Sequence, residues 1–107
     1  MVRKVNLPVK LQKKAVAQNL EMVCRANDII YLGLFGSFGR GQQQKKSDID
    51  LLVRFDQSKE KSLLDLIHAE QEMRKVFKRK VDLVTEGSLS PYIKDDILKE
   101  VKVIYEK

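Results

Sequence analysis

The sequence predicts an α/β fold in which helices pack on one mixed sheet. Short apolar segments rich in β-branched residues alternate with longer segments whose apolar residues recur every three or four positions. At 107 residues, the chain is long enough for one hydrophobic core and too short for two. With 43% hydrophobic and 34% charged residues, its composition is that of a globular domain and not of a disordered segment. We therefore expect residues 1–107 to form a single domain.

The first half of the chain predicts a helix, a strand, a loop and a second strand. Between residues 9 and 26 apolar residues recur at helical steps, and Cys24 is expected at the edge of that apolar face. Residues 29–35 are β-branched and aromatic, which is typical of a buried strand. Residues 36–46 contain three glycines and no apolar period, so they predict a loop, and residues 48–55 predict the second strand.

A helix begins the second half of the chain. Ser62 stands three residues before Asp65, which is the spacing of a capping box, and the helix is expected to run to about Phe77. The basic run over residues 78–80 suits the negative end of its dipole. Its predicted buried stripe consists of Leu63, Leu66, Ile67, Met73, Val76 and Phe77.

A strand, a helix and an edge strand complete the predicted order. Residues 81–84 are mostly apolar and β-branched. Ser90 followed by Pro91 is typical of an N-cap and the first position of a helix, which we expect to reach about Glu100. Residues 101–105 predict a strand at the edge of the sheet.

Composition also limits the classes of function. The longest uncharged stretch has 11 residues, whereas a membrane span needs roughly 20, and no signal-peptide core is evident, so we expect a cytoplasmic protein with no membrane partner. Because Cys24 and His68 are the only cysteine and histidine, any metal must be held by carboxylates. The net charge of +6 would attract nucleic acid or a phosphate-bearing substrate, but such a surplus is common on solvated helices, and we favour that interpretation.

Three aspartates carry the chemistry that we expect. Asp48 and Asp50 are two residues apart in a predicted strand, so their carboxylates share one face beside apolar neighbours. Asp82 lies in the next apolar strand, and if the two strands are neighbours all three carboxylates converge. Such a cluster can hold two divalent ions roughly 3.5–4 Å apart, an arrangement suited to phosphoryl transfer.

The loop after the first strand predicts a phosphate site. Gly36 and Ser37 would let backbone amides approach a phosphate closely, although the pair also fits an ordinary turn. Arg40, between Gly39 and Gly41, can contact either a phosphate or an acid of the loop. The glycine spacing excludes the dinucleotide-binding and P-loop patterns.

In this order, the motifs resemble a known family. GSFGRG at 36–41, a five-residue spacer and SDIDL at 47–51 resemble the G-S-x-x-R-G-x5-S-D-I-D-L signature of the minimal nucleotidyltransferases of the DNA polymerase β superfamily. Asp82 falls where that family has its third metal-binding acid, and the similarity covers nearly the whole chain. Two departures are the glycine at 39 and the absence of a proline from 42–46. The resemblance implies the polymerase β-like nucleotidyltransferase fold.

The resemblance also implies roles for individual residues. Asp48 and Asp50 would bind two Mg²⁺ ions, and Asp82 would ligate the catalytic ion and help to deprotonate the acceptor hydroxyl. ATP would be the substrate. The implied nucleotide-binding residues are Gly36, Ser37, Arg40 and Ser47.

For the acceptor, the resemblance implies a protein partner. Stand-alone members of the family act as antitoxins of HEPN ribonuclease toxins, in a type VII-like toxin–antitoxin pair, and transfer AMP to a toxin tyrosine. A chain this short would borrow its acceptor surface from such a partner or from a second copy. Alternatives are neutralisation by occlusion alone and transfer to a small molecule. A DNA-binding autoregulator is ranked last, because no helix has an evident recognition face, so nucleic acid is not an expected partner.

Other polar and aromatic residues are expected to be structural. His68 is predicted to have a helix-surface or packing role and not a catalytic one, because carboxylate chemistry needs no histidine. Tyr31, Tyr92 and Tyr105 are predicted to pack in the core or at the sheet edge and not to accept nucleotide.

Overall fold

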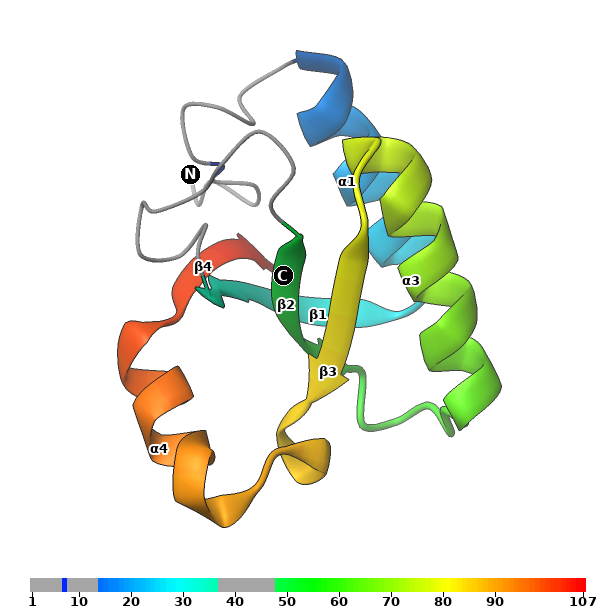
Figure 1. The fold of residues 1–107 in the computed structure, drawn as a ribbon. Coiled ribbons are helices and arrows are strands. Elements are labelled where there is room, and N and C mark those ends of the chain that lie inside the picture. Colours follow the sequence, from blue (N-terminus) through cyan, green and yellow to red (C-terminus); the bar gives the residue numbers. More distant parts are fainter. Residues whose placement is uncertain (1–6, 8–13, 37–47) are drawn as a thin grey trace.

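A computed structural model of the chain describes residue 7 and residues 14–36 and 48–107. In chain order, the elements of these ranges are α1 (Lys14–Ala26), β1 (Ile29–Phe35), β2 (Ile49–Phe55), α3 (Leu63–Phe77), β3 (Val81–Thr85), the 3₁₀ helix η2 (Glu86–Ser88), α4 (Pro91–Glu100) and β4 (Lys102–Glu106). The strands form one sheet in the order β3-β2-β1-β4 (Figure 1). β2 and β3 are parallel, whereas β1 is antiparallel to both β2 and β4. The predicted mixed sheet is therefore confirmed.

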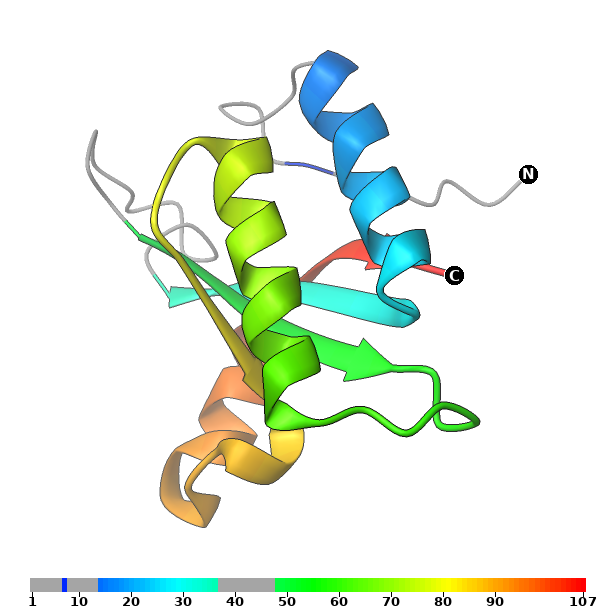
Figure 2. The ribbon, with the colours of Figure 1, turned by 90° about the vertical axis from the view of Figure 1, so that its right-hand side faces the viewer.

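One face of the sheet is covered by two helices. α1 and α3 lie side by side on it, as Figures 1 and 2 both show. The core between helices and sheet includes Leu20, Leu32, Leu51 and Met73, all fully buried. Burying a side chain of this size contributes roughly 1.5–3 kcal/mol to stability. α4 lies apart from these two helices and buries none of its residues.

Most predicted boundaries agree with the structure. β1 matches its predicted range, β2 begins one residue later than predicted, and β4 lies at the sheet edge as expected. The Ser62 hydroxyl accepts a hydrogen bond from the backbone N–H of Asp65, whose carboxylate accepts in return from the Ser62 backbone, so the capping box is confirmed. Ser90 caps α4 and Pro91 opens it. Residues 9–13 of the first predicted helix lie outside the described residues.

Part of the predicted buried stripe of α3 was wrong. Leu63 and Ile67 are 70% and 41% exposed, whereas Ala69, which was not predicted, is fully buried with Met73. At 3.6 residues per turn, Leu63 and Ile67 lie roughly 80° and 120° around the helix from Met73, whereas Leu66, which packs on the core, lies within about 20°. Spacing alone did not reveal which side of this broad apolar surface faces the sheet.

Two further predictions of side-chain position were wrong. Cys24 is fully buried in the core and not at the edge of the helix, because it follows Leu20 by four residues and faces the sheet with it. Tyr92 is 92% exposed, since it belongs to α4, which packs on little else. Tyr31 and Tyr105 are buried as predicted. Within the ranges that the structure describes, no helix combines the length and apolar character that a membrane span requires.

Candidate active site

Two carboxylates lie on adjacent strands at one end of the sheet. Asp50 of β2 and Asp82 of β3 are partners in the register of the parallel pair. Residues in register on neighbouring strands share a face, so both carboxylates stand on the same side of the sheet. Ile49 and Leu51, which flank Asp50, belong to the core under the helices. The acids therefore face away from α1 and α3, and the predicted placement of Asp82 beside Asp50 is confirmed.

Asp48 lies at this same end of the sheet, one residue before β2. The backbone N–H of Ile49 donates to the carbonyl oxygen of Lys80 at 2.9 Å, which joins the starts of β2 and β3. Lys80 Nζ lies 3.8 Å from Asp48 Oδ2, and both side chains are largely exposed, so this ion pair contributes little to stability. Its effect is to bring a positive charge beside the acids.

Gly36 closes the site from the side of β1. Phe35, the last residue of β1, pairs with Asp50, and Gly36 follows with a φ of 70°, a left-handed conformation that favours glycine. A Cβ at this position would lie closer to Asp50 Oδ2 than the 3.0 Å that real Cβ contacts respect. The absence of a side chain at Gly36 thus lets the backbone pass directly against the Asp50 carboxylate.

The carboxylate oxygens of Asp50 and Asp82 suit a hard divalent cation. Two adjacent carboxylates repel each other unless a cation or proton lies between them, and their oxygens are the ligands that Mg²⁺ and Mn²⁺ prefer. In the described part of the chain, no three His, Cys, Asp or Glu side chains come close enough together to hold a metal ion. The structure thus brings Asp50 and Asp82 together but does not bring Asp48 into one group with them, and joint binding of a metal by the three acids stays a prediction. Ser37, Arg40 and Ser47 lie outside the described residues.

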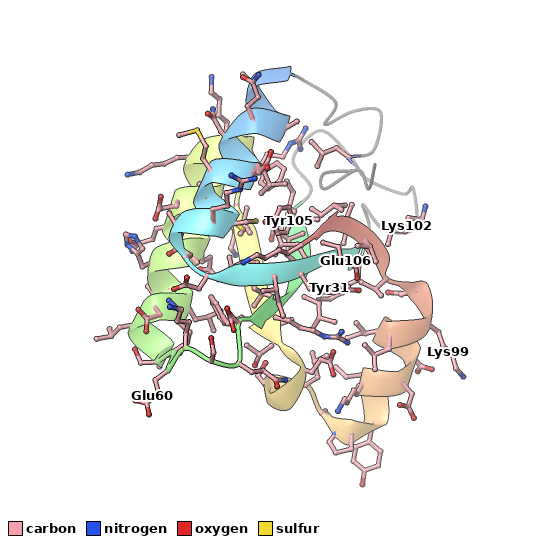
Figure 3. All side chains as sticks on the ribbon, turned by 180° about the vertical axis from the view of Figure 1, so that it is seen from behind. Tyr31, Glu60, Lys99, Lys102, Tyr105 and Glu106 are labelled. Atoms are coloured by element: carbon pink, nitrogen blue, oxygen red, sulfur yellow. The ribbon has the colours of Figure 1, made fainter. Side chains whose placement is uncertain are left out.

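Farther along the same sheet face lies a cluster that sequence reasoning missed. The Arg54 guanidinium stacks over the Tyr31 ring, 4.6 Å from its centroid, and Arg54 Nε donates to Glu86 Oε1 at 2.6 Å. Arg54 therefore links η2 to β2. Because side chains alternate along a strand, the four-residue separation of Arg54 from Asp50 could have indicated that both lie on the same face of the sheet. Burial raises the pKa of Tyr31, with Arg54 acting against it. Burial thus disfavours the charged form of Tyr31, which is labelled in Figure 3.

His68 has the surface role that the sequence predicted. Its side chain is 65% exposed on α3, and its Nε2 lies 2.6 Å from Glu72 Oε1, one helical turn away. It faces the groove between α1 and α3, on the covered side of the sheet and away from the acids. The aspartate site therefore contains no histidine among the residues described.

A search for related proteins identifies the family. The sequence profile of the nucleotidyltransferase domain matches residues 16–104, which include the paired aspartates, the whole of β1, β2 and β3, and the first part of β4. The chain belongs to the nucleotidyltransferase domain family. This nucleotidyltransferase is 45% identical, over 67 residues, to a candidate protein adenylyltransferase of Methanocaldococcus jannaschii, a match that covers 63% of the chain and 70% of that protein. It is 39% identical over 70 residues to the protein adenylyltransferase MntA of Thermococcus cleftensis, a match that covers 65% of the chain and 69% of that protein.

Solved structures share the fold of this nucleotidyltransferase. A toxin–antitoxin crystallised with AMP-PNP superposes with a TM-score of 0.68 at 23% identity, over 84% of this chain and 73% of that one. A complex of an MNT antitoxin with the tri-AMPylated HEPN toxin of Shewanella oneidensis gives a TM-score of 0.60 at 20% identity, over 86% and 73%. At these identities, the likeness establishes the fold of the domain.

Proposed function

We propose that this nucleotidyltransferase moves AMP from ATP to a tyrosine hydroxyl of a HEPN ribonuclease toxin and so acts as the antitoxin of the pair. The observation that carries the proposal is that Asp50 and Asp82 are partners in the register of β2 and β3, with Gly36 packed against the Asp50 carboxylate. The names of the related proteins support adenylyl transfer to a protein, and the structural neighbours support a toxin as the partner. A cytoplasmic location, which we expect from the sequence, is part of this proposal.

The three aspartates would hold Mg²⁺ at the end of the sheet. Bound Mg²⁺ would neutralise the triphosphate and lower the pKa of the attacking hydroxyl. Asp48, Asp50 and Asp82 are the proposed ligands, and their carboxylates supply the oxygen donors that this ion prefers. Lys80, beside Asp48, supplies a further positive charge on the approach of an anionic substrate.

In the proposed reaction, the acceptor oxygen attacks the α-phosphorus of ATP in line. The bond from that phosphorus to the β-phosphate oxygen breaks, pyrophosphate leaves, and the hydroxyl proton passes to the Asp82 carboxylate. Backbone amides at Gly36, with Ser37, Arg40 and Ser47, are the proposed contacts to the triphosphate. Because these groups position reactants and stabilise charge, most of the rate gain comes from orientation and electrostatics.

The test is transfer of label from ATP carrying its label on the α-phosphate. The chain is incubated with Mg²⁺ and with the protein encoded beside its gene, and Asp50→Asn and Asp82→Asn are compared with wild type. Asp95→Asn is the matched control, because Asp95 is an exposed aspartate of α4. We expect wild type and the control to label a partner tyrosine and both site variants to lose that labelling.

Each alternative predicts another result. If the partner is neutralised equally by wild type and Asp82→Asn without any label, occlusion explains neutralisation and the enzymatic proposal is wrong. If label appears on a small molecule and never on protein, the proposed acceptor is wrong. Thermal unfolding of each variant checks that lost activity is not lost folding.

A further inference from the structure

The outer edge of β3 contacts two side chains of α3. Among the residues that the structure describes, β3 is the outermost strand on its side of the sheet, and its edge toward β2 is the one with a strand partner. On the other edge, the backbone N–H of Leu83 donates to Glu70 Oε2 at 3.0 Å. Arg74 Nη2 donates to Glu70 Oε1 at 3.0 Å and lies 3.5 Å from the carbonyl oxygen of Val81. Glu70 and Arg74 thus occupy the place of a missing neighbouring strand.

These contacts lie on both sides of Asp82. In a strand, alternate residues direct their backbone groups to the same edge, so Val81 and Leu83 face α3 while Asp82 bonds toward β2. Val81 and Leu83 are 0% and 4% exposed, so water does not readily replace a lost partner there. Without Glu70, the Leu83 N–H would lose its acceptor, and the outer edge would keep only the contact at 3.5 Å from Arg74, which would itself lose its carboxylate partner, beside the residue whose side chain must be held in place.

The Glu70–Arg74 pair has the geometry of an orienting contact. Its side chains are 25% and 44% exposed, so the ion pair by itself contributes little to stability. Its four-residue spacing on α3 points the Glu70 carboxylate at the strand edge, and one carboxylate oxygen serves each partner. We propose that Glu70, oriented by Arg74, is a positioning residue that holds Asp82 in place for metal binding and adenylyl transfer. This inference rests on the proposed function for the role of Asp82.

The same helix provides a matched control. Glu72 has a 31% exposed side chain, and it pairs with His68 and accepts a hydrogen bond from Asn27, which follows α1. Glu72→Ala therefore removes a glutamate of similar exposure and pairing from α3 without touching β3. Glu70→Gln is the conservative variant, since its amide oxygen can still accept from Leu83.

The experiment measures Mn²⁺ binding by electron paramagnetic resonance in the presence of a non-hydrolysable ATP analogue. Because groups that support metal ligands typically contribute 10–100-fold to affinity, we expect Glu70→Ala to weaken Mn²⁺ binding by about tenfold. Glu70→Gln should restore most of the affinity, and Glu72→Ala should leave it unchanged. Amide hydrogen exchange should be faster at Leu83 in Glu70→Ala alone. If the alanine variant does not fold, Glu70→Met keeps the side-chain length and the helix propensity.

Activity assays then separate this inference from the proposed function. If Mn²⁺ binding falls as expected but wild type transfers no AMP, the proposed function is wrong and the positioning role stands. The positioning role is overturned if Glu70→Ala binds Mn²⁺ as wild type does, or if Glu72→Ala loses as much affinity. It is also overturned if wild type binds no Mn²⁺ with nucleotide present.

Discussion

Replacing Gly36 by alanine tests the close approach of backbone and carboxylate at the site. A non-glycine residue in the left-handed conformation found there costs roughly 1–2 kcal/mol. In addition, Asp50 Oδ2 would have to retreat by about 1 Å before the new Cβ reached the 3.4 Å of ordinary contact. A displacement of about 1 Å at a reacting centre can reduce the rate by about 100-fold. We therefore expect Gly36→Ala to remain folded and to lose about two orders of magnitude in adenylyl transfer.

Urea unfolding measures the loss of stability in Gly36→Ala, and the labelled-ATP assay separately measures the loss of adenylyl transfer. Gly87→Ala is the control, because no heavy atom of the described residues, apart from its chain neighbours, lies within 4 Å of a Cβ at that position, and its φ is not left-handed. We expect the control to keep wild-type stability and activity. The reasoning about this site is refuted if Gly36→Ala is as active as the control, or if its activity falls only in proportion to its unfolded fraction.

Three further predictions concern stability and reactivity. Lys78 ends α3 with a φ of 56°, so Lys78→Gly should stabilise the protein by about 1 kcal/mol in urea unfolding; a destabilised variant contradicts this. Hydrogen bonds from the Ser62 backbone and hydroxyl lower the pKa of Asp65 in the folded protein. The ionised Asp65 side chain therefore contributes fully to the stability of the fold above the ordinary aspartate pKa, and this contribution is lost as the pH falls through the lowered pKa. Asp65→Asn should therefore show a weaker loss of melting temperature in acid than wild type, and equal losses would oppose that assignment. Burial raises the pKa of Cys24 to about 12, so native protein should resist thiol reagents that label the unfolded chain, and rapid native labelling would contradict its burial.

Local signals in the sequence were sufficient to predict most of the fold. The caps at Ser62 and Ser90 depend on neighbouring backbone groups, so a few adjacent residues determine where α3 and α4 begin. Strand β1 was equally predictable, because its apolar run ends at a glycine. The exposed Leu63 and Tyr92 were not predictable in this way, since their exposure depends on where each helix lies relative to the sheet.

The same distinction applies to the site. Strand periodicity predicts a shared face for Asp48 and Asp50, although Asp48 lies just before β2, whereas the position of Asp82 beside Asp50 required that β2 and β3 be neighbours. Strand order depends on contacts between distant segments, and here the family resemblance implied that these two strands are neighbours. The hydrogen bond from Leu83 to Glu70 joins a strand to the preceding helix, and no sequence spacing predicted it. Contacts between elements are therefore what the structure adds.

Anomalous diffraction from a crystal of the chain grown with Mn²⁺ and a non-hydrolysable ATP analogue tests the central claim most directly. The account predicts a manganese peak within coordination distance of the Asp50 and Asp82 carboxylates, on the sheet face away from α1 and α3, with the triphosphate against Gly36. A nucleotide bound elsewhere, or manganese that contacts neither carboxylate, would contradict it.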